Sequence, residues 1–359
     1  MIYEYWFAKI KGVSCVKKKK LREYFKTAEA IYYIEEIKLQ ASGILTEKEI
    51  EKVIEAKSQA DLKKQWEQLQ DKKIHFVPYF SKAYPERLHD IPSPPYALYV
   101  KGALPDMSKP TVSIVGARNC THYGETEALE YGERLAENGV NIVSGMARGV
   151  DGAGQRGALN VGGRTYAVLG CGVDVCYPKE HWGLYQDILK DGGIISEQLP
   201  GSPPFASYFP ARNRIISGLS DIVLVIEARE KSGSLITADQ ALEQGKEVFA
   251  LPGPVTSLLS QGCHRLIDQG AGILITPEEL LETMGIILSK CRQNNLPEKK
   301  VLESTENMVY SCVDLFPKGL QQLSEETKLA PEILLEHLIT LELQGVVKEI
   351  SKNYYVKTR

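Results

Sequence analysis

The stretch TVSIVGARNCTHYGETEALEYGERLAENGVNIVSG, residues 111–145, decides the fold. It begins with an apolar run and a glycine turn, continues through a polar segment able to form a helix, and ends in a second apolar run followed by glycine. Short apolar runs flanked by turn residues are typical of buried strands. The stretch therefore predicts two parallel strands joined by a crossover helix.

The same alternation continues along the chain to residue 276. Each further apolar run is separated from the next by a segment able to form a helix: TYAVLG at 165, GIISEQL at 193, DIVLVIEA at 221, EVFALPG at 247 and GILIT at 272. Strands that alternate with helices predict a parallel sheet covered on both faces. We expect an α/β fold with a Rossmann-like, doubly wound, mostly parallel sheet, extended by two earlier strands, IHFVPY at 74 and YALYVKG at 96.

The remaining segments predict smaller units at both ends. Residues 1–72 show helix-period apolar positions and no strand alternation, which predicts a helical domain of the SAM-like or helix-hairpin-helix-like kind. Residues 73–288 form the expected sheet domain, and the polar residues 289–302 are expected to be a linker. Residues 303–359 contain helix, turn, helix and two short strands, which is the order of a winged helix.

One N-terminal segment has two interpretations. In KGVSCVKKKKLREYF, Lys11–Phe25, a glycine turn precedes a run of lysines. We interpret the run as a solvated basic helix face, and a helix-hairpin-helix contact with phosphate is the alternative.

Composition limits the classes of function. The formal net charge of -3 and the pI of about 6.2 exclude a generally basic coat for nucleic acid, so a polyanion site must be a local patch. The 7 cysteines form no C-x-x-C pair and the 6 histidines have no metal-binding spacing, so we expect reduced thiols, no metal and no cofactor. No run of about 18 apolar residues occurs, and we expect a soluble, cytoplasmic protein without membrane insertion.

Candidate binding residues follow the expected strands. In open α/β sheets, ligands bind at the carboxyl ends of the strands, where helix N-termini present free N–H groups. Glycine permits close approach of backbone to an anion, and arginine binds phosphate through a planar fork. Five successive loops supply such residues: Gly116, Arg118 and Asn119; Ser144, Gly145 and Arg148; Lys179; Arg212, Asn213 and Arg214; Lys231, Ser232, Gly233 and Ser234. Together they predict a phosphate-binding surface.

Catalytic motifs are missing from these loops. The sequence contains no phosphate-loop signature, dinucleotide fingerprint, nucleophile elbow or zinc-protease motif. The acidic residues near strand ends are Asp151, Asp174, Glu197 and Glu227. A hydrolase would pair two of them with a water, but we favour roles in orienting arginines and capping helices because no nucleophile or metal set accompanies them.

The motifs of residues 114–253 resemble one known family. IVGARNCTHYG, NIVSGMARGVDGAGQRGAL, AVLGCGVDVCYPKEH, FPARNRIISGLSDIVLVIEA and KSGSLITADQALEQGKEVFALPG occur in the same order in the DprA/Smf family of DNA-processing proteins. The resemblance implies a Rossmann-like core that binds single-stranded DNA, forms homodimers and helps load the recombinase RecA during natural transformation.

The resemblance also assigns residues. It implies that Arg118, Lys179, Arg212, Arg214 and the SGS loop lie at the DNA surface. It implies subunit contacts at His264, Ile267 and Ile273. The sequence departs from the family where many relatives read AHRGAL, because residues 154–156 here are Gly, Gln and Arg. The missing imidazole weakens an acid–base enzymatic interpretation.

We therefore expect a non-enzymatic, dimeric single-strand-DNA chaperone, and the alternative is a nucleotide-phosphate-binding enzyme such as a nucleoside-monophosphate hydrolase with Glu227 or Asp151 as base. Single strands are held by cationic grooves with rings for base stacking. Phe205, Tyr208 and Phe209 are candidates for those rings, and packing in the core is the alternative. The second helix of the expected winged helix, APEILLEHLITLELQG, is acidic and lacks Lys and Arg. We therefore expect that unit to be a protein-interaction or regulatory module, and a cap that only stabilises the fold is the alternative.

Overall fold

A nine-stranded sheet forms the centre of the protein, seen in a computed structural model that describes residues 1–58, 61–286 and 304–358. The strand order is β1-β2-β6-β5-β4-β3-β7-β8-β9. The strands span His75–Pro78 (β1), Ala97–Gly102 (β2), Thr111–Val115 (β3), Asn141–Ser144 (β4), Thr165–Leu169 (β5), Gly193–Ser196 (β6), Ile222–Val225 (β7), Glu247–Ala250 (β8) and Gly272–Ile273 (β9). Every strand expected from the apolar runs is present.

The pairing confirms the predicted mostly parallel sheet. Strands β3 to β9 pair in parallel, whereas β1 pairs antiparallel with β2, and β2 antiparallel with β6. Val112 of β3 lies beside Ile142 of β4 on one side and Ile222 of β7 on the other. The chain thus runs outward from β3 in one direction and then resumes at β7 in the other. A reversal of this kind opens a crevice at the carboxyl ends of the two strands.

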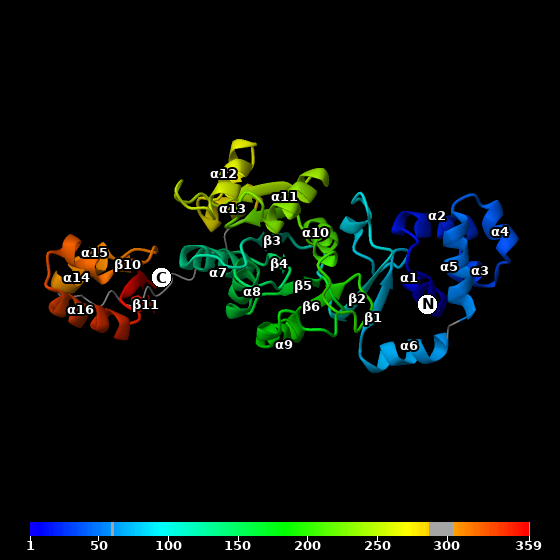
Figure 1. Cartoon of the computed structure of the whole chain (residues 1–359), viewed down its shortest axis with the longest axis horizontal. Coiled ribbons are helices and arrows are strands. Elements are labelled where there is room, and N and C mark those ends of the chain that lie inside the picture. The colour runs from blue at the N-terminus through cyan, green and yellow to red at the C-terminus, as the bar shows by residue number, and fades with distance from the viewer. Residues whose placement is uncertain (59–60, 287–303, 359) are drawn as a thin grey trace.

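Helices cover both faces of the sheet (Figure 1). One face packs against apolar residues of α10 (Tyr208–Leu219), α11 (Gly233–Glu243) and α12 (Gln261–Asp268). The other face packs against α7 (His122–Glu137), α8 (Val150–Asn160), α9 (Trp182–Asp191) and α13 (Pro277–Thr283). Alternate residues of each strand pack against the helices on opposite faces, because successive side chains point to opposite faces of the sheet. This explains why the strands read as continuous apolar runs.

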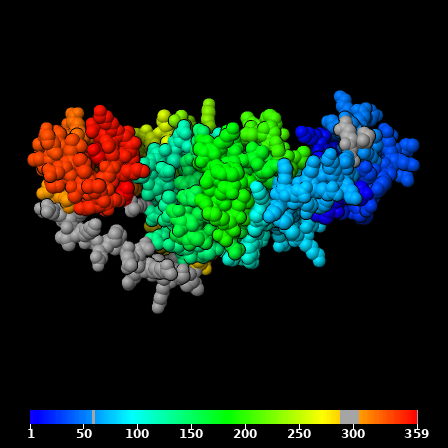
Figure 2. Space-filling model, turned by 90° about the horizontal axis from the view of Figure 1, so that it is seen from below, coloured from blue at the N-terminus to red at the C-terminus, as the bar shows by residue number. Residues whose placement is uncertain are grey.

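The N-terminal residues form six helices beside β1 and β2 (Figure 1). In the space-filling view they gather at one end of the molecule (Figure 2). They span Ile2–Lys9 (α1), Cys15–Phe25 (α2), Ala28–Tyr33 (α3), Glu36–Ala41 (α4), Glu47–Ser58 (α5) and Leu62–Asp71 (α6). Their apolar side chains share one cluster with the sheet, in which Tyr5 lies edge-on to Phe76 and to Tyr99. The helices therefore pack directly on the sheet. That residues 1–72 form a separate domain remains a prediction.

The lysine run of α2 differs from the expected solvated face. Lys18 is buried, and its ammonium donates to the Ala8 carbonyl at 2.7 Å. Lys17 pairs with Glu49, and Lys19 donates to the Tyr79 hydroxyl. The prediction of a solvated face is wrong for Lys18 because helix α2 turns that position toward α1. Burial lowers the pKa of Lys18 to about 8.

The C-terminal residues form three helices and a small antiparallel sheet of order β10-β12-β11. These elements span Ser304–Cys312 (α14), Lys318–Gly319 (β10), Leu320–Thr327 (α15), Pro331–Leu343 (α16), Val347–Ser351 (β11) and Tyr354–Lys357 (β12). They enclose their own apolar cluster, which includes Leu323, Leu338 and Tyr355. The expected linker, residues 289–302, lies outside the described residues. No helix in the described ranges is both long and apolar enough to cross a membrane.

Helices α7 and α8 approach each other closely at glycines. A methyl group on Gly132 of α7 would stand 2.2 Å from the carbonyl oxygen of Gly154, and one on Gly157 of α8 would stand 2.1 Å from that of Leu129. Both contacts are with backbone atoms, which cannot move away as a flexible side chain could. The two glycines therefore set the distance between the helices that begin at the ends of β3 and β4.

This contact predicts that Gly132→Ala destabilises the fold. Forcing a methyl group into a packed contact costs about 1–3 kcal/mol, so the free energy of unfolding in urea should fall by that amount. Gly183→Ala of α9 is the matched control, because no atom lies within 4 Å of its added methyl group. The control should equal or slightly exceed the wild type, since alanine favours helix. Equal stabilities of Gly132→Ala and wild type would contradict the close contact.

Candidate nucleic-acid interface

A groove crosses the carboxyl ends of β5, β4, β3 and β7, where the strand order reverses. It consists of two adjoining pockets of about 400 and 530 Å³. We call the two together the crest groove. They share the following lining residues: Arg118, Ala147, Tyr177, Pro204, Phe209 and Arg212. The groove thus runs without a break between the β5 end and the β7 end.

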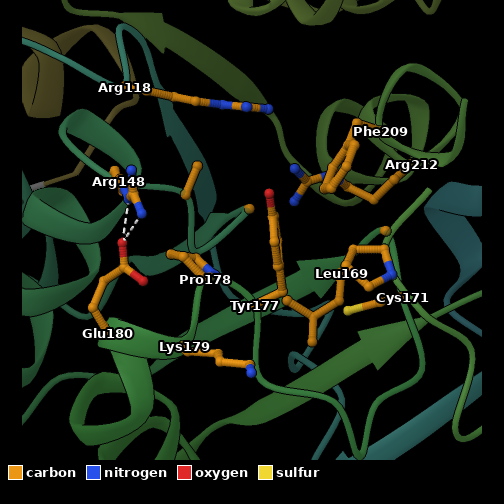
Figure 3. A pocket seen from close by; sticks show the side chains of 14 residues that line it. Arg118, Arg148, Leu169, Cys171, Tyr177, Pro178, Lys179, Glu180, Phe209 and Arg212 are labelled. Atoms are coloured by element: carbon orange, nitrogen blue, oxygen red, sulfur yellow. Dashed lines mark hydrogen bonds and ion pairs between the residues drawn. The ribbon is translucent and has the colours of Figure 1, made fainter. Parts of the chain in front are cut away.

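Arg118 and two aromatic rings form the middle of the crest groove (Figure 3). Arg118 lies in the loop after β3 and extends across the groove, with its guanidinium carbon 5.5 Å from the centre of the Phe209 ring. Phe209 comes from α10, and its ring centre lies 5.7 Å from that of Tyr177. A cation beside aromatic faces offers one contact for phosphate and another for a base.

Arg212 is a buried cation beside this centre. It lies on α10 with 7% of its surface exposed, and its Nη1 donates to the carbonyl of Val168. Its Nε has no hydrogen-bond partner within the described residues. Burial, helped by nearby Arg118, lowers the pKa of Arg212 to about 10 against the opposing effect of nearby Asp151. The guanidinium therefore stays charged at neutral pH, while little water screens it.

Asp151 is the buried acidic residue whose negative charge acts on Arg212. Its carboxylate is buried and accepts the N–H of Gly145 at 3.1 Å. Burial raises the pKa of Asp151, against the opposing effects of Arg212 and of the Gly145 N–H. The carboxylate thus holds the loop after β4 and partly balances the buried guanidinium. That Asp151 orients the arginine, as expected from the sequence, stays a prediction.

The β7 end of the crest groove carries the hydroxyl groups. Ser232 is the N-cap of α11, and its Oγ accepts the N–H of Ser234 at 3.4 Å. The two hydroxyl oxygens lie 2.8 Å apart. Asn213 of α10 donates to the Gly233 carbonyl at 3.3 Å, which ties the loop to the groove wall. A helix N-terminus with hydroxyl groups suits an anion.

The β5 end carries Arg148 and Lys179. Arg148 forms an ion pair with Glu180, and both side chains are exposed (Figure 3). Lys179 begins a short 3-10 helix, η2 (Lys179–His181), and its side chain is exposed. His181 contacts the Met146 carbonyl through Nδ1 at 3.1 Å, which fastens η2 to the loop after β4. Cations therefore line the groove to its end.

Most of the residues that the sequence nominated come together here. The nominated residues that line the crest groove are Gly116, Arg118, Gly145, Arg148, Lys179, Arg212, Asn213, Ser232, Gly233 and Ser234. Asn119 and Lys231 are exposed but do not line it.

Two nominated residues need correction. Ser144 is fully buried, and its hydroxyl donates to the Ile114 carbonyl at 2.6 Å, so it has no surface to offer a ligand. Arg214 lies on another side of α10, where it pairs with Glu197 at 2.7 Å. Its position on the helix separates it from Arg212, since residues two apart do not face the same way.

Two glycines of the groove, Gly116 and Gly145, pack closely against neighbouring side chains. A methyl group on Gly116 would stand 2.7 Å from the Val150 side chain, and one on Gly145 would stand 2.0 Å from Nη1 of Arg212. Both glycines therefore make room for neighbouring protein groups. Both also line the crest groove, so the expected approach of a phosphate to their backbone stays a prediction.

Sequence reasoning missed other lining residues. Of the three nominated rings, Phe209 lines the crest groove, whereas Phe205 and Tyr208 do not. Tyr177 lines both pockets and was missed, although it stands beside Lys179 in the YPK motif. The sequence could also have predicted the burial of Arg212, because Ile215, Ile216 and Leu219 follow it at helical spacing and form one buried stripe.

The other acidic candidates have structural partners. Glu227 accepts both the N–H of Thr121 at 2.8 Å and its hydroxyl at 2.7 Å, which holds the start of α7. Asp174 pairs with Lys72 and accepts the N–H of Gly201. Among the described residues, no group of three His, Cys, Asp or Glu side chains is placed to hold a metal ion.

The nominated subunit-contact residues lie near the β9 edge. Ile273 is in β9 with 49% of its surface exposed. Ile267 of α12 is partly buried against the core. The His264 ring contacts the carbonyl of Gly253 at 2.9 Å within the chain.

The contacts of Glu227 predict a structural role. Glu227→Ala should lower the free energy of unfolding by about 1–2 kcal/mol, because two donors of Thr121 lose their acceptor at a partly buried helix start. Urea denaturation measures this change. Glu230→Ala, at an exposed glutamate, is the control and should leave stability within about 0.5 kcal/mol. Unchanged stability of Glu227→Ala would contradict the capping role.

The region that contains the crest groove is similar to known proteins. Residues 75–285 match the family described as DNA recombination-mediator protein A. Protein Smf of Escherichia coli is 40% identical over 297 residues, which cover 78% of this chain and 76% of that protein.

Two solved structures are similar as well. The X-ray structure of DNA processing protein A (DprA) from Streptococcus pneumoniae has 35% identity and a TM-score of 0.71, covering 79% of this chain and 97% of that one. DNA processing protein A from Helicobacter pylori, solved for its single-stranded DNA binding mode, has 31% identity and a TM-score of 0.54, covering 59% and 95%. The chain belongs to the family of DNA recombination-mediator protein A, the DprA/Smf family.

Proposed function

We propose that this protein binds single-stranded DNA along the crest groove, protects incoming DNA and helps to load a RecA-type recombinase in natural transformation and recombination. The observation that carries the proposal is the buried, charged Arg212 beside exposed Arg118 and the rings of Phe209 and Tyr177. The Helicobacter pylori relative, described for its single-stranded DNA binding, supports the same ligand.

The groove suits a polymer of phosphates. Cations occur at its β5 end and at its centre, and a hydroxyl-bearing helix start lies at its β7 end. A strand laid along it would place successive phosphates near Lys179, Arg118 and Ser232. The aromatic surface between them accepts any base, because every base has a flat face. Binding should therefore depend strongly on salt and little on sequence.

The proposed role is not catalytic. The alternative, a nucleoside-monophosphate hydrolase, needs a free carboxylate to activate water. Glu227 is engaged by Thr121, and Asp151 by the Gly145 N–H beside Arg212. Gln155, at the position where many relatives have histidine, is buried and donates to the Tyr166 carbonyl. These engagements favour binding over hydrolysis.

We also propose the domain organisation expected from the sequence: a helical domain at 1–72, a DNA-binding domain at 73–288, a linker at 289–302 and a winged helix at 303–359. The order α14, β10, α15, α16, β11, β12 supports the last of these. Helix α16 presents exposed Glu332, Glu336 and Glu342 and exposed Ile339. An acidic, partly apolar helix repels DNA and favours a protein contact.

We propose a homodimer formed through the β9 edge. Ile273 and Ile275 are both exposed beside this edge strand. An uncovered strand edge with apolar side chains tends to pair with another chain. A second copy would cover both features at once.

Exchange of Arg118 tests DNA binding. Arg118→Ala should weaken binding to an oligo(dT) strand at least tenfold at low salt, because a central phosphate contact is lost. It should also reduce the slope of log K against log[salt] by about 0.7. Fluorescence anisotropy of a labelled strand at several salt concentrations measures both.

The matched control is Arg164→Ala. Arg164 is exposed and precedes β5, at the opposite end of the strands. The control removes the same charge but should bind like the wild type. Equal losses in the two variants would mean a general charge effect. Failure of the wild type to bind single strands, together with release of base or phosphate from a mononucleotide, would favour the hydrolase.

Exchange of Ile273 tests the dimer. Ile273→Asp should convert the protein to a monomer in light scattering after gel filtration, because a charge would be buried at the β9 edge. Val16→Asp, at an exposed position of α2, is the control and should leave the mass unchanged. A dimeric Ile273→Asp variant would place the subunit contact elsewhere.

A further inference from the structure

We propose that the DNA path continues past Lys179 onto helix α9, where Trp182 stacks on a nucleobase of the bound strand. This inference rests on the proposed function and deepens it, since it assigns a further binding residue and a longer footprint. Trp182 is outside the crest groove as its lining defines it.

Trp182 is an exposed ring held in a fixed position. It is the first residue of α9, and 57% of its surface is exposed. Its ring lies parallel to that of Tyr185, at 5.5 Å between centres and 10° between planes. Tyr185 is buried, and its hydroxyl donates to the Val173 carbonyl at 2.7 Å. One face of the indole is thus supported by a buried ring, and the exposure leaves the other face to solvent.

The helical register connects this ring to the groove. Lys179, Trp182 and Tyr185 follow one another at intervals of three across η2 and the start of α9. Residues three apart on a helix are surface neighbours, with about 5–6 Å between Cβ atoms. Lys179 lines the end of the crest groove. A phosphate bound at Lys179 therefore brings the attached nucleotide within reach of the indole.

The turn that carries Lys179 and Trp182 is fastened to the groove wall. Glu180 pairs with Arg148, and His181 contacts the Met146 carbonyl at 3.1 Å. Both contacts join η2 to the loop after β4. Because the turn is held at two points, the stacking surface is organised before DNA arrives, which reduces the ordering that binding requires.

An exposed tryptophan can also be covered by a protein partner or by a second copy of this chain. The observations favour a base. The indole lies three residues after Lys179, which lines the end of the cationic groove, and it is stacked on the Tyr185 ring. Alternating cations and flat rings are the pattern by which proteins hold single strands.

Intrinsic fluorescence of the full chain tests the proposal. The protein has 3 tryptophans, and the other two, Trp6 and Trp66, lie in the N-terminal helices. Saturating oligo(dT) should quench the emission of the wild type and of Trp66→Phe. The quenching should disappear in Trp182→Phe, whose ring still stacks but whose indole emission is gone. Anisotropy of a labelled strand establishes saturation independently in each variant.

Affinity gives a second readout. Loss of one stacked base weakens binding about 5-fold to 150-fold, so Trp182→Ala should show a loss in this range. Trp182→Phe should recover most of it. The slope of log K against log[salt] should stay at the wild-type value in both, because no phosphate contact is removed. Thermal melting confirms that each variant is folded.

The outcomes separate the two proposals. If the wild type binds DNA but Trp182 emission does not change and Trp182→Ala binds normally, the stacking proposal is overturned and the proposed function stands. If Trp182→Ala changes only the oligomeric mass in light scattering, Trp182 is a subunit contact and the proposal is likewise overturned. If the wild type does not bind DNA at all, the proposed function itself fails.

Discussion

A buried guanidinium at the carboxyl edge of the sheet, that of Arg212, constrains every element around it. Its Nη1 donates to the Val168 carbonyl at the end of β5, which fixes helix α10 against that strand. Gly145 has no side chain because the guanidinium fills the space where one would stand. Asp151 supplies the nearby negative charge and holds the loop after β4. Burying a charge is tolerated only with such compensation.

The same constraint explains why the site suits anions. Burial shifts the pKa of Arg212 to about 10, so its charge persists in the physiological range. Its Nε is left without a partner in the described part of the chain. Exposed Arg118 stands nearby and contributes to this lowering of the pKa of Arg212. In the proposed complex, a phosphate near both cations would relieve their mutual repulsion. The arrangement supports the proposed binding of a negatively charged strand, to which the rings of Phe209 and Tyr177 would add surface for bases.

Much of the fold could be predicted from the sequence because buried parallel strands are short apolar runs, and these occur in the same order as the strands. The loops at their carboxyl ends could be predicted as well, since parallel strands bring those ends to one edge. The burial of Ser144, the pairing of Arg214 with Glu197 and the packing role of Gly145 could not be predicted. Each depends on which neighbour fills the space beside a residue. Those neighbours depend on which way helix α10 is rotated against the sheet and on the order of the strands. The local sequence around each residue specifies neither.

Hydrogen–deuterium exchange of the full chain, with and without a saturating oligo(dT) strand, tests the central claim most directly, because it reports which backbone amides the DNA covers. We expect protection to be concentrated in the loops at residues 116–119, 145–148, 177–180 and 232–234 and at the start of α10. Protection confined to the N-terminal helices or to residues 304–358, with these loops unchanged, would contradict the assignment of the crest groove as the DNA-binding site.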